Sequence, residues 1–207
     1  MNALIIVDLQ NDFCPGGSLA VKEGDKIVSL INDLQKEFHL VVATQDWHPK
    51  DHGSFASNQK KKPGEKIMLN GLEQILWPDH CVQGTKGAEF VAGLDMNHID
   101  KIFQKGTDKM VDSYSGFFDN GHKKATGLGD YLKKKDVTDL YVTGLATDYC
   151  VKYTALDAVK LGFNTILLKE ACRGVNLQPG DVDRAVVEMI DAGVKVVKNG
   201  MLLKAKK

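Results

Sequence analysis

Near its start the chain carries the apolar run Leu4-Ile5-Ile6-Val7, which stops at a charged residue, Asp8. A short continuous apolar run is typical of a strand that is buried on both faces, as in a parallel sheet. Comparable runs follow at residues 40–44, 101–103, 140–143, 165–168 and 194–197. Together these runs predict a central sheet of about six strands.

Helical periodicity fills several of the intervals between these runs. Apolar residues recur at helical spacing over 25–38, 148–161 and 181–192, with polar residues between them. Repeated alternation of strands and helices predicts an α/β fold, with a mostly parallel sheet between two layers of helices. We expect residues 1–207 to form one domain with this three-layer αβα, Rossmann-type architecture.

One segment, at about 45–99, lacks strong periodicity and is rich in Gly, Pro and His. A stretch of this length inside a compact domain usually carries function or contains short elements of its own. We expect it to do both, as a long loop region that binds a metal and the substrate.

Composition excludes several classes of partner. The 207 residues include 27 Lys+Arg and 27 Asp+Glu, so the formal net charge is zero, and the basic cluster at 204–207 is expected to be a solvated tail. No overall field would attract nucleic acid or an anionic membrane. The apolar run at 3–7 is too short for a signal peptide or a membrane span. Four scattered cysteines without a CxxC pair predict reduced thiols in a cytoplasmic protein: Cys14, Cys81, Cys150 and Cys172.

Polar residues stand directly after the predicted strands. Asp8 follows the first strand, Asp46 and His48 the second, Lys105 the third, and Cys150 comes shortly after the fourth. Taken singly, an Asp after a strand is often a turn residue, and a Lys there is usually solvated. Because the carboxyl ends of parallel strands border one crevice, however, we expect these side chains to lie together.

Cys150 differs from the other cysteines, for which inert burial is expected, because it falls in the first turn of a predicted helix. There the backbone N–H groups and the helix dipole favour an anion, so we expect a lowered thiol pKa and a site for an oxyanion. A thiolate attacks acyl carbons, and a neighbouring carboxylate can take the thiol proton and return it to a leaving amine. No histidine stands beside Cys150, which favours Asp8 as proton carrier with Lys105 keeping it ionised.

A second group of residues has the chemistry of metal ligands. Asp46 and His48, two positions apart, point to one side of an extended segment, and His80 on the long loop can complete a set of N and O ligands. Such a set suits Zn, Fe(II) or Mn. Trp47 and Trp77 flank these residues and can wall a flat apolar substrate. The other histidines, His39, His98 and His122, are expected to be structural or exposed.

Six segments match a known family in sequence and in order. They are IVDLQNDF (6–13), TQDWHP with HGSFA (44–49 and 52–56), WPDHCVQG (77–84), KGTD (105–108), DSYSGF (112–117) and GLATDYCV (144–151). Over nearly its whole length the chain therefore resembles nicotinamidases of the isochorismatase-like cysteine hydrolase superfamily. This resemblance implies an isochorismatase-like fold.

The resemblance also implies a role for individual residues. It implies a cis peptide bond between Leu145 and Ala146, and zinc as the default metal, with iron or manganese as alternatives. For a further protein contact to the metal, His52 and Ser54 are both candidates. The implied sets are the catalytic triad Asp8, Lys105 and Cys150, an oxyanion hole from the backbone N–H groups of Ala146 and Cys150, the metal ligands Asp46, His48 and His80, and the pocket walls Phe13, Trp77 and Tyr114.

The expected activity is hydrolysis of nicotinamide to nicotinate and ammonia through a thioester, which is a step in NAD salvage. Pyrazinamide is expected as a second substrate, and a homo-oligomer is one expected assembly. The nearest alternative is a related amidase for carbamoyl or ureido substrates, although such relatives generally lack the metal trio. Isochorismatases proper lack the nucleophilic cysteine.

A nucleotide- or flavin-binding module would need a phosphate loop or GxGxxG after the first strand, which is absent. A metal or redox sensor using Cys150 and Cys81 would show no protection of Cys150 by nicotinamide in thiol titrations.

Overall fold

Six parallel strands form one sheet in the order β5-β2-β1-β6-β7-β8. The computed structural model describes residues 1–197, so the basic cluster at 204–207 lies outside the described residues. All six predicted strands are confirmed. Their bounds are β1 (Asn2–Val7), β2 (Val41–Asp46), β5 (Lys101–Lys105), β6 (Asp139–Leu145), β7 (Asn164–Arg173) and β8 (Lys195–Val197).

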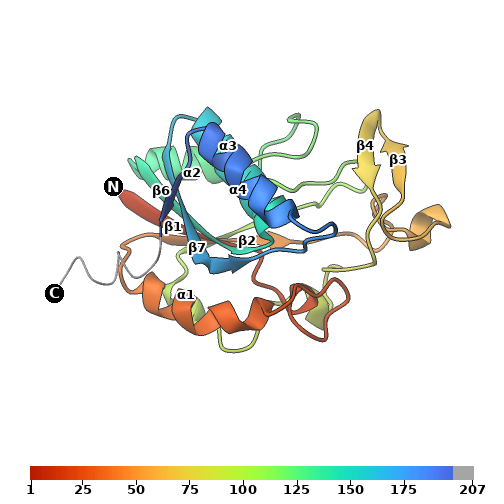
Figure 1. Cartoon of the computed structure of the whole chain (residues 1–207), viewed down its shortest axis with the longest axis horizontal. Helices are drawn as coiled ribbons and strands as arrows, with labels where there is room; N and C mark the ends of the chain where they lie inside the picture. Colours follow the sequence, from red (N-terminus) through yellow and green to blue (C-terminus); the bar gives the residue numbers. More distant parts are fainter. Residues whose placement is uncertain (198–207) are drawn as a thin grey trace.

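Helices cover both faces of this sheet, which confirms the three-layer αβα architecture. Figure 1 shows α1 (Val28–Gln35) on one side and α2 (Leu128–Lys134), α3 (Lys152–Lys160) and α4 (Asp181–Asp191) on the other.

The central strand β1 explains the uninterrupted apolar run at the start of the chain. Ala3, Ile5 and Val7 pack into the core beneath α2, α3 and α4. Leu4 and Ile6 pack into the core on the α1 side. All five side chains are fully buried. Because neither face of β1 meets water, its sequence has no polar alternation.

The helices differ from the sequence prediction in detail. Helix α1 is shorter than the predicted 25–38, because a 3₁₀ turn at Gly24–Ile27 precedes it. The helix predicted at 148–161 consists of a π-helical turn, Thr147–Val151, followed by α3. Sequence periodicity missed α2, which has only seven residues and two fully buried leucines, Leu128 and Leu132. Two apolar positions are too few to define a period.

The segment at 45–99 contains short elements, as expected. β3 (Lys66–Leu69) and β4 (Leu72–Ile75) form an antiparallel hairpin outside the main sheet. In Figure 1 this hairpin lies beyond the end of the sheet, on the side opposite the N-terminus. Within the described residues, no helix has the length and apolar character that a membrane span requires. The four cysteines are all free.

The close approach of β6 to β1 depends on Gly144. This residue faces Val7 in the register of the two strands and has φ +113°, in the region that favours glycine. A Cβ at this position would overlap the backbone of Val7. Gly64 has a similar φ of +90°, but a Cβ there would meet nothing within 4 Å.

We therefore expect Gly144→Ala to destabilise the protein much more than Gly64→Ala. The Gly64 variant carries only the conformational cost of a positive φ, about 1–2 kcal/mol. The Gly144 variant adds a backbone collision at the centre of the sheet, for a total of roughly 3 kcal/mol or more. Urea unfolding of both variants measures the difference. Equal losses would show that the β1–β6 contact does not require a glycine.

Candidate active site

The strand order places four predicted site residues side by side. Lys105 ends β5, Asp46 ends β2, Asp8 follows β1, and Cys150 lies in the π-helical turn after β6. These four strands are consecutive neighbours in the sheet. From β1 the chain adds β2 and β5 on one side of the sheet, and it then adds β6, β7 and β8 on the other side. The boundary between β1 and β6 is therefore a topological switch point, which is where ligands bind in open α/β sheets. The sequence expectation that these residues share one edge is confirmed.

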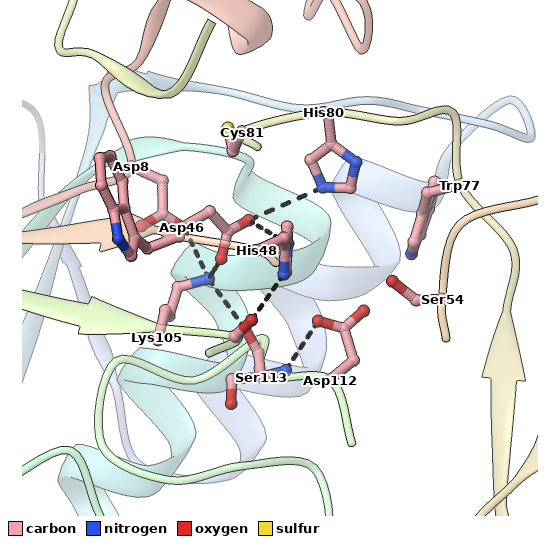
Figure 2. Close-up of polar contacts among 12 residues, drawn as sticks. Asp8, Asp46, His48, Ser54, Trp77, His80, Cys81, Lys105, Asp112 and Ser113 are labelled. Carbon is pink, nitrogen blue, oxygen red and sulfur yellow. Dashed lines mark hydrogen bonds and ion pairs between the residues drawn. The ribbon is translucent and has the colours of Figure 1, made fainter. Parts of the chain in front are cut away.

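Lys105 is the centre of this group, and its side chain is completely buried. Its Nζ lies 2.9 Å from Asp8 Oδ2 and 2.5 Å from Asp46 Oδ1. The ammonium also donates to the Ser113 carbonyl at 2.8 Å and lies 3.4 Å from Cys150 Sγ. Figure 2 shows Lys105 reaching between Asp46 and Ser113. The predicted triad is thus assembled around one buried cation.

Asp46 uses its second oxygen toward two histidines. Its Oδ2 lies 3.6 Å from His48 Nε2 and 3.8 Å from His80 Nε2. Figure 2 shows both rings facing this carboxylate. Ligand atoms of the three residues lie within 4.8 Å of one another, and all three side chains are buried. The residues predicted to bind a metal are therefore brought together.

The other ring nitrogens show that this set suits a metal. His48 Nδ1 lies 2.8 Å from the Gly106 carbonyl, and His80 Nδ1 lies 2.7 Å from the Pro78 carbonyl. Because a carbonyl only accepts, each neutral ring carries its proton on Nδ1 and keeps a lone pair on Nε2. His48 Nε2 is buried without a hydrogen-bond partner among the described residues. One carboxylate oxygen and two such nitrogens match the donors that zinc takes.

His52 and Ser54, the candidates for a further metal contact, lie in a neighbouring group. His52 Nδ1 lies 2.7 Å from Ser54 Oγ. His52 groups with His48 and Asp112, whereas the same His48 also groups with Asp46 and His80.

The residues predicted to wall a substrate pocket do line one pocket. Phe13, Trp77 and Tyr114 border it together with Cys150 and Ala146. Trp77 and Tyr114 meet edge to face, and the Trp77 indole N–H donates to the Tyr114 hydroxyl at 3.1 Å. The Leu145–Ala146 peptide bond is cis, as the resemblance implies. Four further residues line the pocket and were not predicted from the sequence: Leu19, Asp112, Tyr149 and Val175.

Comparison with known proteins agrees with this geometry, since residues 2–199 match the isochorismatase domain. The chain belongs to the isochorismatase family.

Relatives within the isochorismatase family are close to this chain in sequence and structure. An Escherichia coli nicotinamidase is 50% identical over 195 residues, covering 92% of each chain. The structure of a nicotinamidase and pyrazinamidase from Acinetobacter baumanii is 46% identical, with a TM-score of 0.94 over 97% of each chain. A Pyrococcus horikoshii pyrazinamidase in complex with zinc is 41% identical, with a TM-score of 0.78 over 95% of this chain and 98% of that one.

Burial and charge set the protonation states of this isochorismatase-family site. Burial alone favours a neutral Lys105, but the carboxylates of Asp46 and Asp8 raise its pKa well above its usual range. Burial raises the pKa of Asp8 and outweighs the opposing effect of Lys105. Burial also raises the pKa of Asp46, but the charges of Lys105 and His48 outweigh it, so the pKa of Asp46 is lowered. Asp46 is therefore the firmly ionised partner, and Asp8 is the carboxyl that can exchange a proton.

The expected lowering of the Cys150 pKa is wrong. Burial raises the pKa of this thiol well above its usual range, although the Lys105 ammonium favours the thiolate. The sequence suggested a helix terminus, where a thiolate is stabilised, but a fully buried sulfur loses more from desolvation. Cys150 thus starts as a thiol and needs a base beside it.

Two supporting residues were not assigned a role from the sequence. The buried side chain of Gln10 accepts from the Asp46 N–H at 2.8 Å and donates to the Asp46 and Ala88 carbonyls at 2.8 Å. Ser113 contributes only its carbonyl to Lys105. Both residues lie in the matching sequence segments, but their hydrogen bonds to Asp46, Ala88 and Lys105 could not be predicted. These bonds form only where segments distant in the chain pack together.

Gly106 offers a test of the histidine geometry. It has φ +64°, and a Cβ there would overlap the imidazole ring of His48. Gly84 has a similar φ of +75° but nothing within 4 Å of such a Cβ. We expect Gly106→Ala to displace His48 and lower the bound divalent metal by roughly tenfold or more relative to Gly84→Ala.

Metal content after dialysis against trace zinc, measured by elemental analysis, checks this expectation. Circular dichroism of both variants controls for folding. A folded Gly106→Ala protein with undiminished metal content would show that the position of His48 is not needed to hold the ion.

Proposed function

We propose that this chain is a cysteine amidohydrolase that converts nicotinamide to nicotinate and ammonia, with pyrazinamide as a second substrate. The observation that carries the proposal is the buried cluster of Cys150, Asp8 and Lys105 at the wall of an aromatic-lined pocket. Nicotinamidases and pyrazinamidases at 41–50% identity support it. The product nicotinate suits a role in NAD salvage, for which we infer a cytoplasmic location.

The pocket suits a small, flat, neutral amide. Phe13, Trp77 and Tyr114 offer apolar ring faces and edges to an aromatic substrate. Asp46, His48 and His80 would hold a divalent metal, zinc in this proposal, which would supply an electron-pair acceptor for the pyridine nitrogen. Because Cys150 lines the same pocket as these aromatic side chains, a ring held between them would present its carboxamide near the thiol, and such positioning would remove much of the entropic cost of attack.

The proton then moves between Cys150 and Asp8. The Asp8 carboxylate accepts the thiol proton as sulfur attacks the amide carbon, and the backbone N–H groups of Ala146 and Cys150 are proposed to hold the resulting oxyanion. Asp8 returns the proton to the nitrogen as the C–N bond breaks, which releases ammonia and leaves a thioester on Cys150. Water then hydrolyses the thioester to nicotinate. The raised pKa of Asp8 makes it an adequate acid for the return step.

Cys150→Ala should lower ammonia release from nicotinamide by at least about a thousandfold, because Cys150 is the one cysteine among the described residues that lines the pocket. Metal content should stay near that of the wild type, since Sγ is not among the proposed ligands. Cys172→Ala is the matched control, because Cys172 is equally buried but lies in β7 outside the cluster. Substantial turnover by the Cys150 variant would refute the mechanism.

A substrate panel should separate this function from its nearest alternative. We expect ammonia release from nicotinamide and pyrazinamide, little from carbamoyl and ureido amides, and loss of at least about 90% of the activity after chelation, restored by added zinc. Coupled detection of ammonia on the panel provides the measurement. Faster turnover of a ureido substrate would favour the alternative amidase, and nicotinamide turnover that survives complete metal removal would exclude the metal from substrate binding.

A further inference from the structure

Thr44 makes two hydrogen bonds to Asp8, the proposed proton carrier. Thr44 lies in β2 with its side chain fully buried. Its hydroxyl donates to Asp8 Oδ1 at 2.6 Å and accepts from the Asp8 backbone N–H at 3.3 Å. One hydroxyl therefore fixes both the main chain and the carboxyl group of Asp8. Asp8 has φ +45°, so it turns off the end of β1 at this point of contact.

The orientation of Thr44 is fixed from its other side. A Cβ at Gly116 would lie only 2.7 Å from the Thr44 methyl carbon, so this methyl fills the space that the glycine leaves. Gly116 is itself held at both backbone groups: its N–H donates to Thr154 Oγ1 at 2.9 Å, and its carbonyl accepts from Thr126 Oγ1 at 2.6 Å. With the methyl packed there, the hydroxyl stays directed at Asp8.

The two oxygens of Asp8 consequently have different surroundings. Oδ1 accepts from Thr44, whereas Oδ2 lies 2.9 Å from Lys105 Nζ. The same ammonium is 3.4 Å from Cys150 Sγ, so Oδ2 and the thiol border a common cation. A carboxyl oxygen of Asp8 lies within 4.8 Å of this sulfur. Oδ2 is thus the oxygen on the side where the reaction is proposed to occur.

A proton on Oδ1 would disrupt this arrangement. Among the described residues, the Thr44 hydroxyl proton has one acceptor, Asp8 Oδ1. If Oδ1 were protonated, its O–H would donate to Thr44 Oγ1 instead, and the Thr44 hydroxyl proton would lose its acceptor in a buried position. If Oδ2 is protonated, the bond from Thr44 persists. No accepted bond is lost at Oδ2, which has no hydrogen-bond partner among the described residues, because the Lys105 ammonium donates to Asp46, Ser113 and Cys150. The hydroxyl therefore discriminates between the two protonated forms of the same carboxylic acid.

We propose that Thr44 is a positioning residue that keeps the transferred proton on Asp8 Oδ2. In the first step the Cys150 S–H bond breaks and an Oδ2–H bond forms. In the second, the Oδ2–H bond breaks and an N–H bond forms as the C–N bond of the amide is cleaved, so the same proton leaves in ammonia. This role rests on the proposed function, because it concerns the proton that Asp8 carries in that reaction.

The experiment compares Thr44→Val, which keeps the branched shape without the hydroxyl, with Thr44→Ser, which keeps the hydroxyl without the methyl. Thr165→Val is the matched control: Thr165 is a buried threonine in β7 whose hydroxyl binds the Phe163 carbonyl at the opposite end of the sheet. The kcat and KM for nicotinamide, the metal content and the melting temperature are measured for each metal-loaded protein.

We expect Thr44→Val to lower kcat by roughly 10- to 100-fold with KM changed by less than about twofold, as for the loss of a buried hydrogen bond to an ionised group. Thr44→Ser should recover most of the lost kcat, and Thr165→Val should match the wild type. Metal content should be the same in all four proteins.

Three results would overturn the inference. They are a wild-type kcat in Thr44→Val, an equal loss of kcat in the folded Ser and Val variants, and a loss of activity in Thr44→Val that follows loss of metal. Failure of the proposed function is distinguishable, because wild-type protein would then release no ammonia from nicotinamide, and the role of Thr44 would fall with it.

Discussion

The buried ammonium of Lys105 is the constraint on which the rest of this site depends. A cation without access to water costs several kcal/mol unless opposite charges and hydrogen bonds surround it. Here two carboxylates, from the ends of β1 and β2, and the Ser113 carbonyl perform that task. The ends of β1, β2 and β5 and the loop at Ser113 therefore all contact one ammonium group. Moving any of them away would leave this buried charge without a partner.

Asp46 joins this charge cluster to the histidines. One of its oxygens faces Lys105, and the other faces His48 and His80. Gln10 bonds to both backbone groups of Asp46, so the carboxylate cannot turn toward one side without straining the other. The proposed metal centre and the proposed proton-transfer centre are consequently one electrostatic unit, in which a change at either is felt by the other through a shared carboxylate.

Much of this arrangement could be predicted from the sequence. Apolar runs identified all six strands, because the inner strands β1, β2 and β6 are almost entirely buried and the partly exposed edge strands β5 and β8 still carry apolar residues. Residues such as Asp8 and Lys105 could be brought to one edge because parallel strands end together. Helix α2 was missed because it is too short to show a period, and the pKa of Cys150 was misjudged because burial is not visible in a motif. The hydrogen bonds from Thr44 to Asp8 and from Gln10 to Asp46 could not be predicted either, because they form only where distant segments pack together.

The order of the strands has a further consequence for how the site comes into being. Its residues lie between positions 8 and 150, and they meet only after β5, β2, β1 and β6 have paired through long crossovers. Pairings so distant along the chain are slow to form, because loop closure must precede the contacts that repay it. No sheet that lacks one of these four strands contains the complete cluster around Lys105. Competence for chemistry is thus a property of these four assembled strands rather than of any shorter segment of the chain.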